Sequence, residues 1–380
     1  MIIILADNDV DVWLTIYSQI DSKDFWQTEP DLQTERRLVI NWINADISHT
    51  NVWIGLYSSK PNITYKPLYK FITNGQKSGH ISGDNVWYIV YVKDNKILKQ
   101  NCFKTNPNWM QNNLQIIGSK RLNDIVIPGS HDSGCYHKFG LNNIPTKAVY
   151  MYAQDESIFD QLVYGIRYVD IRIGYDDTIE DNNLQIVHGL WSCYHSVAFV
   201  LQQIKDFLDI APKEIVIFDV HKLHGFTDQL GNNIPERHQK LINLIIKFVG
   251  KYIIPENYII GYQDKHLLKN VMTKHLLWDQ VIHRWGNKQT VETLQDYFNE
   301  ELCSHTPKYL HSAMAQMTPS VWETLLHLNS DRGLRQRADS VNPLFNQWFY
   351  NKWKNCINIV SADYFLGSNV VNIAIKINQQ

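Results

Sequence analysis

Short runs of β-branched and aromatic residues alternate with polar, turn-forming residues over the first 112 positions of the chain. Four of these runs occupy residues 12–17, 37–42, 52–57 and 86–92. The polar sequence at 93–96 joins the last run to another strand-like segment, as in a β-hairpin. Strands of this length and spacing predict an all-β domain over residues 1–112, and we expect an antiparallel sandwich of immunoglobulin- or C2-like type.

The pattern changes after a polar, asparagine-rich stretch at residues 105–113, which is the best candidate for a linker. Strand-like segments and amphipathic helical segments alternate from there on. The strand-like segments are residues 124–127, 165–173, 185–187, 214–220 and 356–361, and the helical ones include 157–164, 197–208 and 236–250. The run 214–220 is almost wholly apolar, which is typical of a parallel strand buried on both faces. Repeated strand and helix units predict an α/β fold for residues 113–380, namely a distorted (β/α) TIM-like barrel.

Polar and charged side chains recur where the predicted barrel strands end. They are His131 and Asp132 after the first strand, Asp170 and Arg172 in the second, His188 after the third, His221 after the fourth and Asp363 after the last. The C-terminal ends of barrel strands meet at one mouth, so we expect these groups to converge there. Asp170 and Arg172 are two residues apart and therefore project to the same side of their strand. Histidines, carboxylates and an arginine together are the groups that acid–base phosphoryl transfer requires.

Each of these residues also has a structural role available when it is taken alone. A single histidine among 15 is usually a surface residue or a residue whose hydrogen bonds are satisfied inside the fold. Asp170 and Arg172 would form a structural ion pair as readily as a catalytic one. Their joint occurrence with the histidines at successive strand ends is what favours a catalytic site.

Several motifs carry a resemblance to a known family. They are IPGSHDSG at 127–134, a segment ending in DIR at 161–172, His188 followed by Gly189, EIVI at 214–217 and INIVSADYF at 357–365. In this order and spacing, over roughly residues 115 to 380, they resemble the X domain of phosphatidylinositol-specific phospholipase C. With its β-rich leader, the chain is similar to eukaryotic X-domain-containing proteins that lack the other modules of the large signalling phospholipases.

The resemblance implies a role for each histidine. His131 is implied as the general base that takes the proton from the inositol 2-hydroxyl as that oxygen attacks phosphorus. His188 is implied as the acid that protonates the departing diacylglycerol oxygen. Asp363 is the implied orienting partner of His131, and Asp132 is that of His188. The expected products are inositol 1,2-cyclic phosphate and diacylglycerol.

Arg172 departs from the calcium-dependent members, which carry a second carboxylate at this position. A guanidinium is a bidentate phosphate donor, and its presence removes an oxygen ligand that calcium would need. The sequence therefore resembles the bacterial, metal-independent type, and we expect a calcium-independent phosphoric diester lyase without a metal or cofactor. Inositol-specific relatives tend to carry a cation beside strand four, which makes His221 and Lys222 candidates for headgroup binding. Arg284 is a further candidate.

Two other functions stay open. A metal-dependent glycerophosphodiesterase-like enzyme needs a carboxylate pair to hold magnesium near the first histidine, and Asp170 supplies only half of that pair. A catalytically silent phosphoinositide- or lipid-binding protein would use the barrel as a scaffold and the β-rich leader for recognition. The presence of every expected acid, base and orienting residue weighs against a silent site.

The overall charge limits the class of partner. The chain of 380 residues has 36 Lys and Arg against 38 Asp and Glu, a formal net charge of −2. This balance argues against a nucleic-acid partner and against a polybasic membrane anchor. We therefore expect a phosphatidylinositol-type lipid substrate and a peripheral membrane contact through apolar rim groups, with Trp191 and Trp285 as candidates. The tryptophans expected mostly in the sandwich core are Trp13, Trp42, Trp53, Trp87 and Trp109. The oligomeric state is left open.

The cysteines and the N-terminus bear on location. Five dispersed cysteines have no CxxC pairing, so reduced thiols are expected at Cys102, Cys135, Cys193, Cys303 and Cys356. The first 20 residues lack the cationic start and the long apolar core of a signal peptide. These features predict a cytoplasmic protein.

Overall fold

The computed structural model describes residues 10–20, 34–43, 51–61, 67, 69–71, 77–80, 87–136, 149–179, 183–189, 191–254, 278–304, 309–320 and 333–380. The chain folds into two compact units, which are residues 1–105 with 366–369 and residues 106–365 with 370–380. The predicted division into domains 1–112 and 113–380 stays a prediction, and it differs from these units mainly over residues 106–112.

The smaller unit contains two antiparallel sheets. The first sheet has the strand order β1 (Asp11–Ile20), β2 (Thr34–Ile43), β5 (Lys77–His80). The second has the strand order β4 (Tyr69–Phe71), β3 (Val52–Tyr57), β6 (Trp87–Lys93), β7 (Lys96–Phe103). One hydrophobic core takes side chains from both sheets, such as Leu14 of β1 and Ile89 of β6. The β6–β7 hairpin turns at Asp94 and Asn95, whose φ angles of 49° and 57° match a type I′ turn. The immunoglobulin- or C2-like type of sandwich stays a prediction.

The larger unit is built on a mixed sheet that is mostly parallel. Among the described residues, its parallel strands follow the order β12 (Ile217–His224), β9 (Tyr168–Tyr175), β8 (Ile127–Ser130), β15 (Ile359–Ala362), β14 (His311–Met314), β13 (Ile282–Arg284). An antiparallel hairpin of β10 (Leu184–His188) and β11 (Trp191–Ser196) continues from β9. The strands predicted at 165–173, 185–187, 214–220 and 356–361 are present with shifted ends, but β10 is antiparallel to its neighbour β9. The strand predicted at 124–127 begins only at Ile127, because Leu122–Asp124 form a 3₁₀ turn.

The sheet curls until its outermost parallel strands meet. Five spacings between neighbouring strands would separate β12 and β13 by about 24 Å in a flat sheet. Instead, Nε2 of His283 in β13 lies 2.7 Å from Oδ2 of Asp219 in β12. Side chains bridge this gap, because no backbone pairing of β12 with β13 is seen within the described part of the chain. The curled α/β sheet agrees with the predicted distorted barrel and gathers the C-terminal ends of its strands at one mouth.

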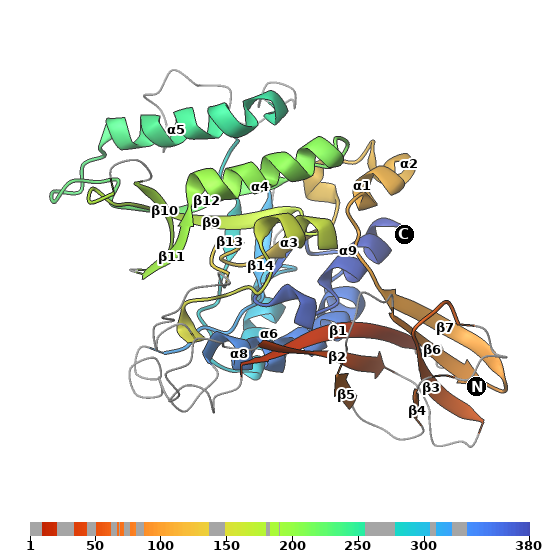
Figure 1. The fold of residues 1–380 in the computed structure, drawn as a ribbon. Coiled ribbons are helices and arrows are strands. Elements are labelled where there is room, and N and C mark those ends of the chain that lie inside the picture. The colour runs from red at the N-terminus through yellow and green to blue at the C-terminus, as the bar shows by residue number, and fades with distance from the viewer. Residues whose placement is uncertain are drawn as a thin grey trace. The chain divides into compact units, whose positions relative to one another are not determined.

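Helices pack on the sheet and on one another. They are α2 (Leu114–Ile117), α3 (Ile158–Tyr164), α4 (Val197–Ile210), α5 (Pro235–Val249), α6 (Val291–Glu301), α8 (Gly333–Val341) and α9 (Val370–Asn378), with 3₁₀ or π turns at Leu122–Asp124, Gly250–Tyr252, Asn342–Leu344, Asn346–Lys352 and Phe365–Gly367. Helix α4 lies between β10 and α5 (Figure 1). Its N-cap Ser196 accepts a hydrogen bond from the N–H of Phe199, and its predicted apolar stripe is buried. No helix among the described residues is long and apolar enough to cross a membrane.

The predicted linker contains a short helix, α1 (Trp109–Asn112), that belongs to the larger unit. Trp109 and Met110 are buried. The carboxylate of Glu214 accepts hydrogen bonds from the N–H groups of Met110 and the next residue, at 3.2 and 2.8 Å. The fully buried Arg167 pairs with the same carboxylate at 2.7 Å. The carboxylate of Glu214 thus satisfies free amides at the start of α1. Trp109 packs in one core cluster with Ile127 and Tyr168 of the barrel, so the prediction that it lies in the sandwich core is wrong.

Two disulfide bonds cross-link the larger unit. They join Cys135 to Cys193 and Cys303 to Cys356, while Cys102 keeps a free thiol. The prediction of reduced thiols is therefore wrong for four of the five cysteines. The paired positions are 58 and 53 residues apart, so each bond joins segments that are distant in the sequence. The cytoplasmic location, which rested partly on reduced thiols, stays a prediction.

Candidate active site

At the C-terminal ends of the barrel strands, one histidine lies between a carboxylate and a guanidinium. His131 follows β8, and its Nδ1 lies 2.7 Å from Oδ1 of Asp363, which follows β15. Nη2 of Arg172 in β9 lies 2.6 Å from Nε2 of the same ring. A guanidinium can only donate, so Nε2 presents its lone pair to Arg172 and the ring proton on Nδ1 is donated to Asp363. This tautomer leaves Nε2 as the basic atom of the ring.

Buried side chains hold the loop that carries His131. Nε2 of Gln154 donates to the carbonyl oxygens of His131 and Ala362, both at 2.8 Å, and so ties the end of β8 to the end of β15. Asp132 has a φ of 41°, a left-handed conformation that costs energy for most side chains. Its N–H donates to Oδ2 of Asp170 at 3.1 Å, which helps to hold this conformation. The loop is therefore fixed before any ligand binds.

Arg172 connects the carboxylates of the cluster. Its Nη2 donates to Oδ2 of Asp170 at 3.2 Å, and its Nη1 lies 3.6 Å from Oδ2 of Asp132. Both carboxylates are fully buried, whereas the side chain of Arg172 is 14% exposed. The ion pair of Asp170 with Arg172 is thus present, but the same guanidinium also contacts His131. Arg172 serves the histidine as well as the buried carboxylates.

Burial and charge oppose each other in this cluster. Burial alone would raise the pKa of Asp170, but Arg172, the two neighbouring histidines His221 and His131 and the N–H of Asp132 together outweigh burial and hold this pKa well below its usual range. Burial raises the pKa of Asp132, against the opposing charges of Arg172 and His188. Burial would lower the pKa of Arg172, and the two carboxylates instead raise it. Arg172 is consequently a permanent cation in front of the charged Asp170.

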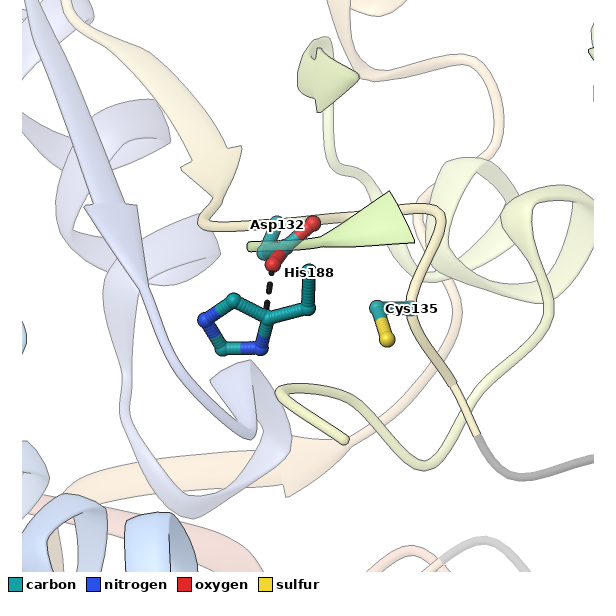
Figure 2. Close-up of side chains that lie close together, drawn as sticks. All are labelled: Asp132, Cys135 and His188. Atoms are coloured by element: carbon teal, nitrogen blue, oxygen red, sulfur yellow. Dashed lines mark ion pairs between the residues drawn. The ribbon is translucent and has the colours of Figure 1, made fainter. Parts of the chain in front are cut away.

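His188, at the end of β10, lies across from His131. The two ring centres are 6.5 Å apart. Nδ1 of His188 is 2.7 Å from the carbonyl oxygen of Met151 and 3.2 Å from Oδ2 of Asp132, the contact dashed in Figure 2. The nearer oxygen takes the Nδ1 proton, so Met151 fixes the ring while the carboxylate of Asp132 contributes charge. Nε2 of His188 is then the nitrogen left for a ligand.

Asp132 and His188 also lie close to Cys135, in a group of potential metal ligands (Figure 2). The sulfur of Cys135 is bonded to Cys193, and a disulfide sulfur is not the thiolate that binds metals. The group therefore offers only an imidazole and a carboxylate. The disulfide instead ties the loop after β8 to β11, the strand paired with β10.

The three predicted substrate-binding residues have different surroundings. Nδ1 of His221 lies 2.9 Å from Nε2 of His283, and burial lowers the pKa of His221 to about 4. Lys222 is exposed and makes no hydrogen bond or ion pair within the described part of the chain. Arg284 donates to Glu301 of α6 at 2.7 Å. The structure does not bring Lys222 or Arg284 to the cluster around His131, and headgroup binding by these residues stays a prediction.

Several contributors could not be recognised from the sequence motifs. The carbonyl of Met151 has no side-chain signature, and Gln154 lies outside every motif. Asp219 lies within the apolar run 214–220, and His283 directly precedes the candidate residue Arg284. A carboxylate inside the apolar run 214–220 was the available signal, since such a charge needs a buried partner.

Comparisons with known proteins lead to one group of relatives, although no family profile matches the chain. PI-PLC X domain-containing protein 1 of Homo sapiens is 23% identical over 324 residues, which are 75% of this chain and 96% of that protein. The 1-phosphatidylinositol phosphodiesterase of Staphylococcus aureus (strain Newman) is 33% identical over 119 residues, which are 31% of this chain and 35% of that protein. The solved phosphatidylinositol-specific phospholipase C from Listeria monocytogenes matches with a TM-score of 0.50 and 20% identity, covering 72% of this chain and 98% of that one. This structural likeness bears on the fold and supports the TIM-like barrel.

Proposed function

Because the chain is related to the PI-PLC X domain-containing proteins and to a bacterial phosphatidylinositol phosphodiesterase, we propose that it cleaves phosphatidylinositol-type lipids as a phospholipase C. The products are inositol 1,2-cyclic phosphate and diacylglycerol. One observation carries the proposal: His131, held between Asp363 and Arg172, has a second histidine 6.5 Å away. Two imidazoles at this separation reach the attacking and the leaving oxygen of one phosphodiester.

His131 is the general base in this scheme. Its Nε2 takes the proton of the inositol 2-hydroxyl while that oxygen forms a bond to phosphorus. Asp363 accepts the Nδ1 proton in a hydrogen bond and stabilises the imidazolium that results. Arg172, which covers the Nε2 lone pair in the free protein, transfers to the phosphate and uncovers the base.

His188 is the general acid. In this scheme its ring enters the reaction with a proton on both nitrogens, and Nε2 gives its proton to the glycerol oxygen as the bond between phosphorus and that oxygen breaks. Met151 holds the Nδ1 proton and so keeps Nε2 directed to the substrate. One proton enters His131 and one leaves His188, so the two rings exchange protonation states and return to the starting state through water.

Arg172 neutralises the charge that grows on the non-bridging phosphate oxygens. Its two Nη atoms already lie near carboxylate oxygens, whose geometry resembles that of a phosphate. Asp170 keeps the guanidinium in place behind the phosphate. The phosphoryl step therefore requires no metal in this proposal.

A lipid substrate requires contact with a membrane surface, and apolar groups near the strand ends are suited to it. Trp285 directly follows β13 and is 50% exposed, and Leu230, in the connection after β12, is 87% exposed. Trp191 instead packs partly against Tyr150 and Leu334. We therefore assign the membrane contact to Trp285 and Leu230 rather than to Trp191.

Purified protein incubated with phosphatidylinositol vesicles in EDTA is expected to release inositol 1,2-cyclic phosphate. The reaction is followed by phosphorus NMR or by chromatography of the water-soluble products, with His188→Ala as the inactive control. Absence of the cyclic product would contradict the proposal. Lipid binding without turnover would favour the silent lipid-binding protein, and turnover only with added magnesium would favour the glycerophosphodiesterase-like enzyme.

Trp285→Ala is expected to weaken binding to phosphatidylinositol vesicles by roughly tenfold, because fully burying an aromatic side chain contributes about 1.5–3 kcal/mol and half of this ring is already covered. Binding is measured by vesicle sedimentation. Trp278→Ala is the matched control, since Trp278 is 36% exposed and precedes β13. If both variants lose the same amount of vesicle binding, the assignment of the membrane contact to Trp285 would be wrong.

The smaller unit is proposed to be a sandwich of immunoglobulin- or C2-like type. The supporting observation is that its two antiparallel sheets share one core. An experimental structure in which the two sheets pack on different partners would contradict this.

A further inference from the structure

A second cluster lies where the curled sheet closes. Asp219 and His221 come from β12 and His283 comes from β13. Nε2 of His283 is 2.7 Å from Oδ2 of Asp219 and 2.9 Å from Nδ1 of His221. One potential ligand atom from each of the three residues lies within 4.8 Å of the other two. The mechanism proposed above uses none of these side chains.

Protons are too few for this arrangement. The hydroxyl of Tyr168 donates to Oδ2 of Asp219 at 2.6 Å. Nε2 of His283 carries at most one proton, yet it faces both the carboxylate and Nδ1 of His221 at hydrogen-bond distance. If this proton forms a linear hydrogen bond to the carboxylate, no His283 proton points at Nδ1 of His221. If it points at His221 instead, no proton lies between His283 and the carboxylate. One of these two contacts therefore brings two lone pairs together with no proton between them.

We propose that Asp219, His221 and His283 form a binding site for a divalent transition-metal ion of the zinc class. Two imidazole nitrogens and one carboxylate oxygen suit zinc and its neighbours, whereas calcium and magnesium prefer oxygen alone. Ligand atoms around tetrahedral zinc are about 3.3 Å apart, given bonds of about 2.0–2.1 Å. The two contacts of His283, at 2.7 and 2.9 Å, need to lengthen by only about half an ångström to reach this spacing.

The surroundings support a metal. Tyr168 is fully buried, and its hydrogen bond orients the carboxylate of Asp219, as outer-shell partners of metal ligands do. A positive ion would also explain why the carboxylate of Asp219 lies within the mostly apolar run 214–220. Three protein ligands leave a coordination position open for water or another ligand.

The site lies on the strand next to the proposed phosphate site. Asp219 stands opposite Asp170 in the β12–β9 register, so the ion would be held beside the strand that carries Arg172. Metal binding does not rest on the proposed phospholipase activity, because the ligands are not the proposed acid, base or phosphate donor. The two proposals can therefore fail separately.

Zinc content is the direct test. Full-length, untagged protein is stripped with EDTA, dialysed against Zn²⁺ and then against metal-free buffer, and analysed by elemental mass spectrometry. About one zinc per chain is expected, and Co²⁺ in its place is expected to give the visible absorption of a four-coordinate site. His283→Asn and His221→Asn are each expected to weaken zinc binding by more than the roughly 10- to 100-fold typical of losing an outer-shell partner.

Matched variants distinguish this site from zinc binding elsewhere on the chain. His224→Asn changes a histidine of the same strand outside the cluster and is expected to retain the ion. Tyr168→Phe keeps all three ligands and is expected to weaken binding by about 10- to 100-fold. If wild type holds no more zinc than the His221→Asn/His283→Asn double variant, the proposal is overturned. It is overturned equally if His188→Asn, rather than His283→Asn, abolishes binding. Circular dichroism of the stripped proteins verifies that the variants are folded.

Discussion

His131→Ala is expected to lower the turnover of phosphatidylinositol by about 10²- to 10⁴-fold, the range typical of removing a general base. The reason is geometric: His131 is the ring whose Nε2 lone pair is set by hydrogen bonds to Asp363 and Arg172. The loss is expected in kcat, with little change in KM, because the base acts on the attacking hydroxyl in the transition state. Initial rates on mixed micelles measure both parameters.

The second histidine sharpens this test. If His131 and His188 act as one acid–base pair, the double variant His131→Ala/His188→Ala is expected to be little slower than either single variant. His238→Ala is the control, because this histidine of α5 packs on Phe226 and lies outside the cluster. Full activity of His131→Ala would exclude the base role. Multiplicative losses in the double variant would exclude the concerted pair.

Arg172→Met is expected to lower both activity and the free energy of unfolding. Turnover falls by about 10²- to 10³-fold, as when a transition-state charge donor is lost. Stability falls by about 3–5 kcal/mol, because Asp132 and Asp170 are then buried without their cation. Urea unfolding at neutral pH measures the stability loss.

Two further variants keep this expectation testable if Arg172→Met does not fold. Arg172→Lys retains the charge but not the fork of donors, so most of the stability is expected to remain while most of the activity is lost. Adding Asp170→Asn to Arg172→Met removes one unpaired carboxylate and is expected to recover part of the lost stability. An Arg172→Lys enzyme with wild-type turnover would show that bidentate phosphate binding is not needed.

The barrel could be predicted because the local pattern of apolar and polar residues indicates most of its strands and helices. The stripe of α4 follows from burial on one face. The run 214–220 is the strand that its apolar composition predicts, but residues 215–220 are half-buried rather than buried on both faces. Helix α1 could not be predicted, since its amides depend on Glu214, more than 100 residues away. The disulfides were missed for the same reason. Pairing of Cys135 with Cys193 depends on the proximity of β11 to the loop after β8, which no local pattern encodes.

The candidate site could be predicted where the functional groups are side chains of residue types that stand out at the ends of strands. His131 and Asp363 were expected as partners, and they lie in contact. The partner of His188 was expected to be Asp132, but the carbonyl of Met151 lies nearer. A backbone carbonyl is present at every residue, so only the folded chain reveals which one is used. The cluster around His283 likewise depends on closure of the sheet between β12 and β13.

The Cys135–Cys193 bond has a consequence for where this chain functions. In the chain-entropy view, a disulfide between residues 58 positions apart lowers the conformational entropy of the unfolded chain and so stabilises the folded state by about 4 kcal/mol. The bond also ties the loop of His131 to the hairpin of His188, so it helps to hold the two rings at their spacing. Glutathione keeps such thiols reduced in the cytosol, whereas secretory compartments allow them to pair. The folded state of this chain would therefore be less stable in the cytosol, where the bond is reduced, than in a secretory compartment, where it forms.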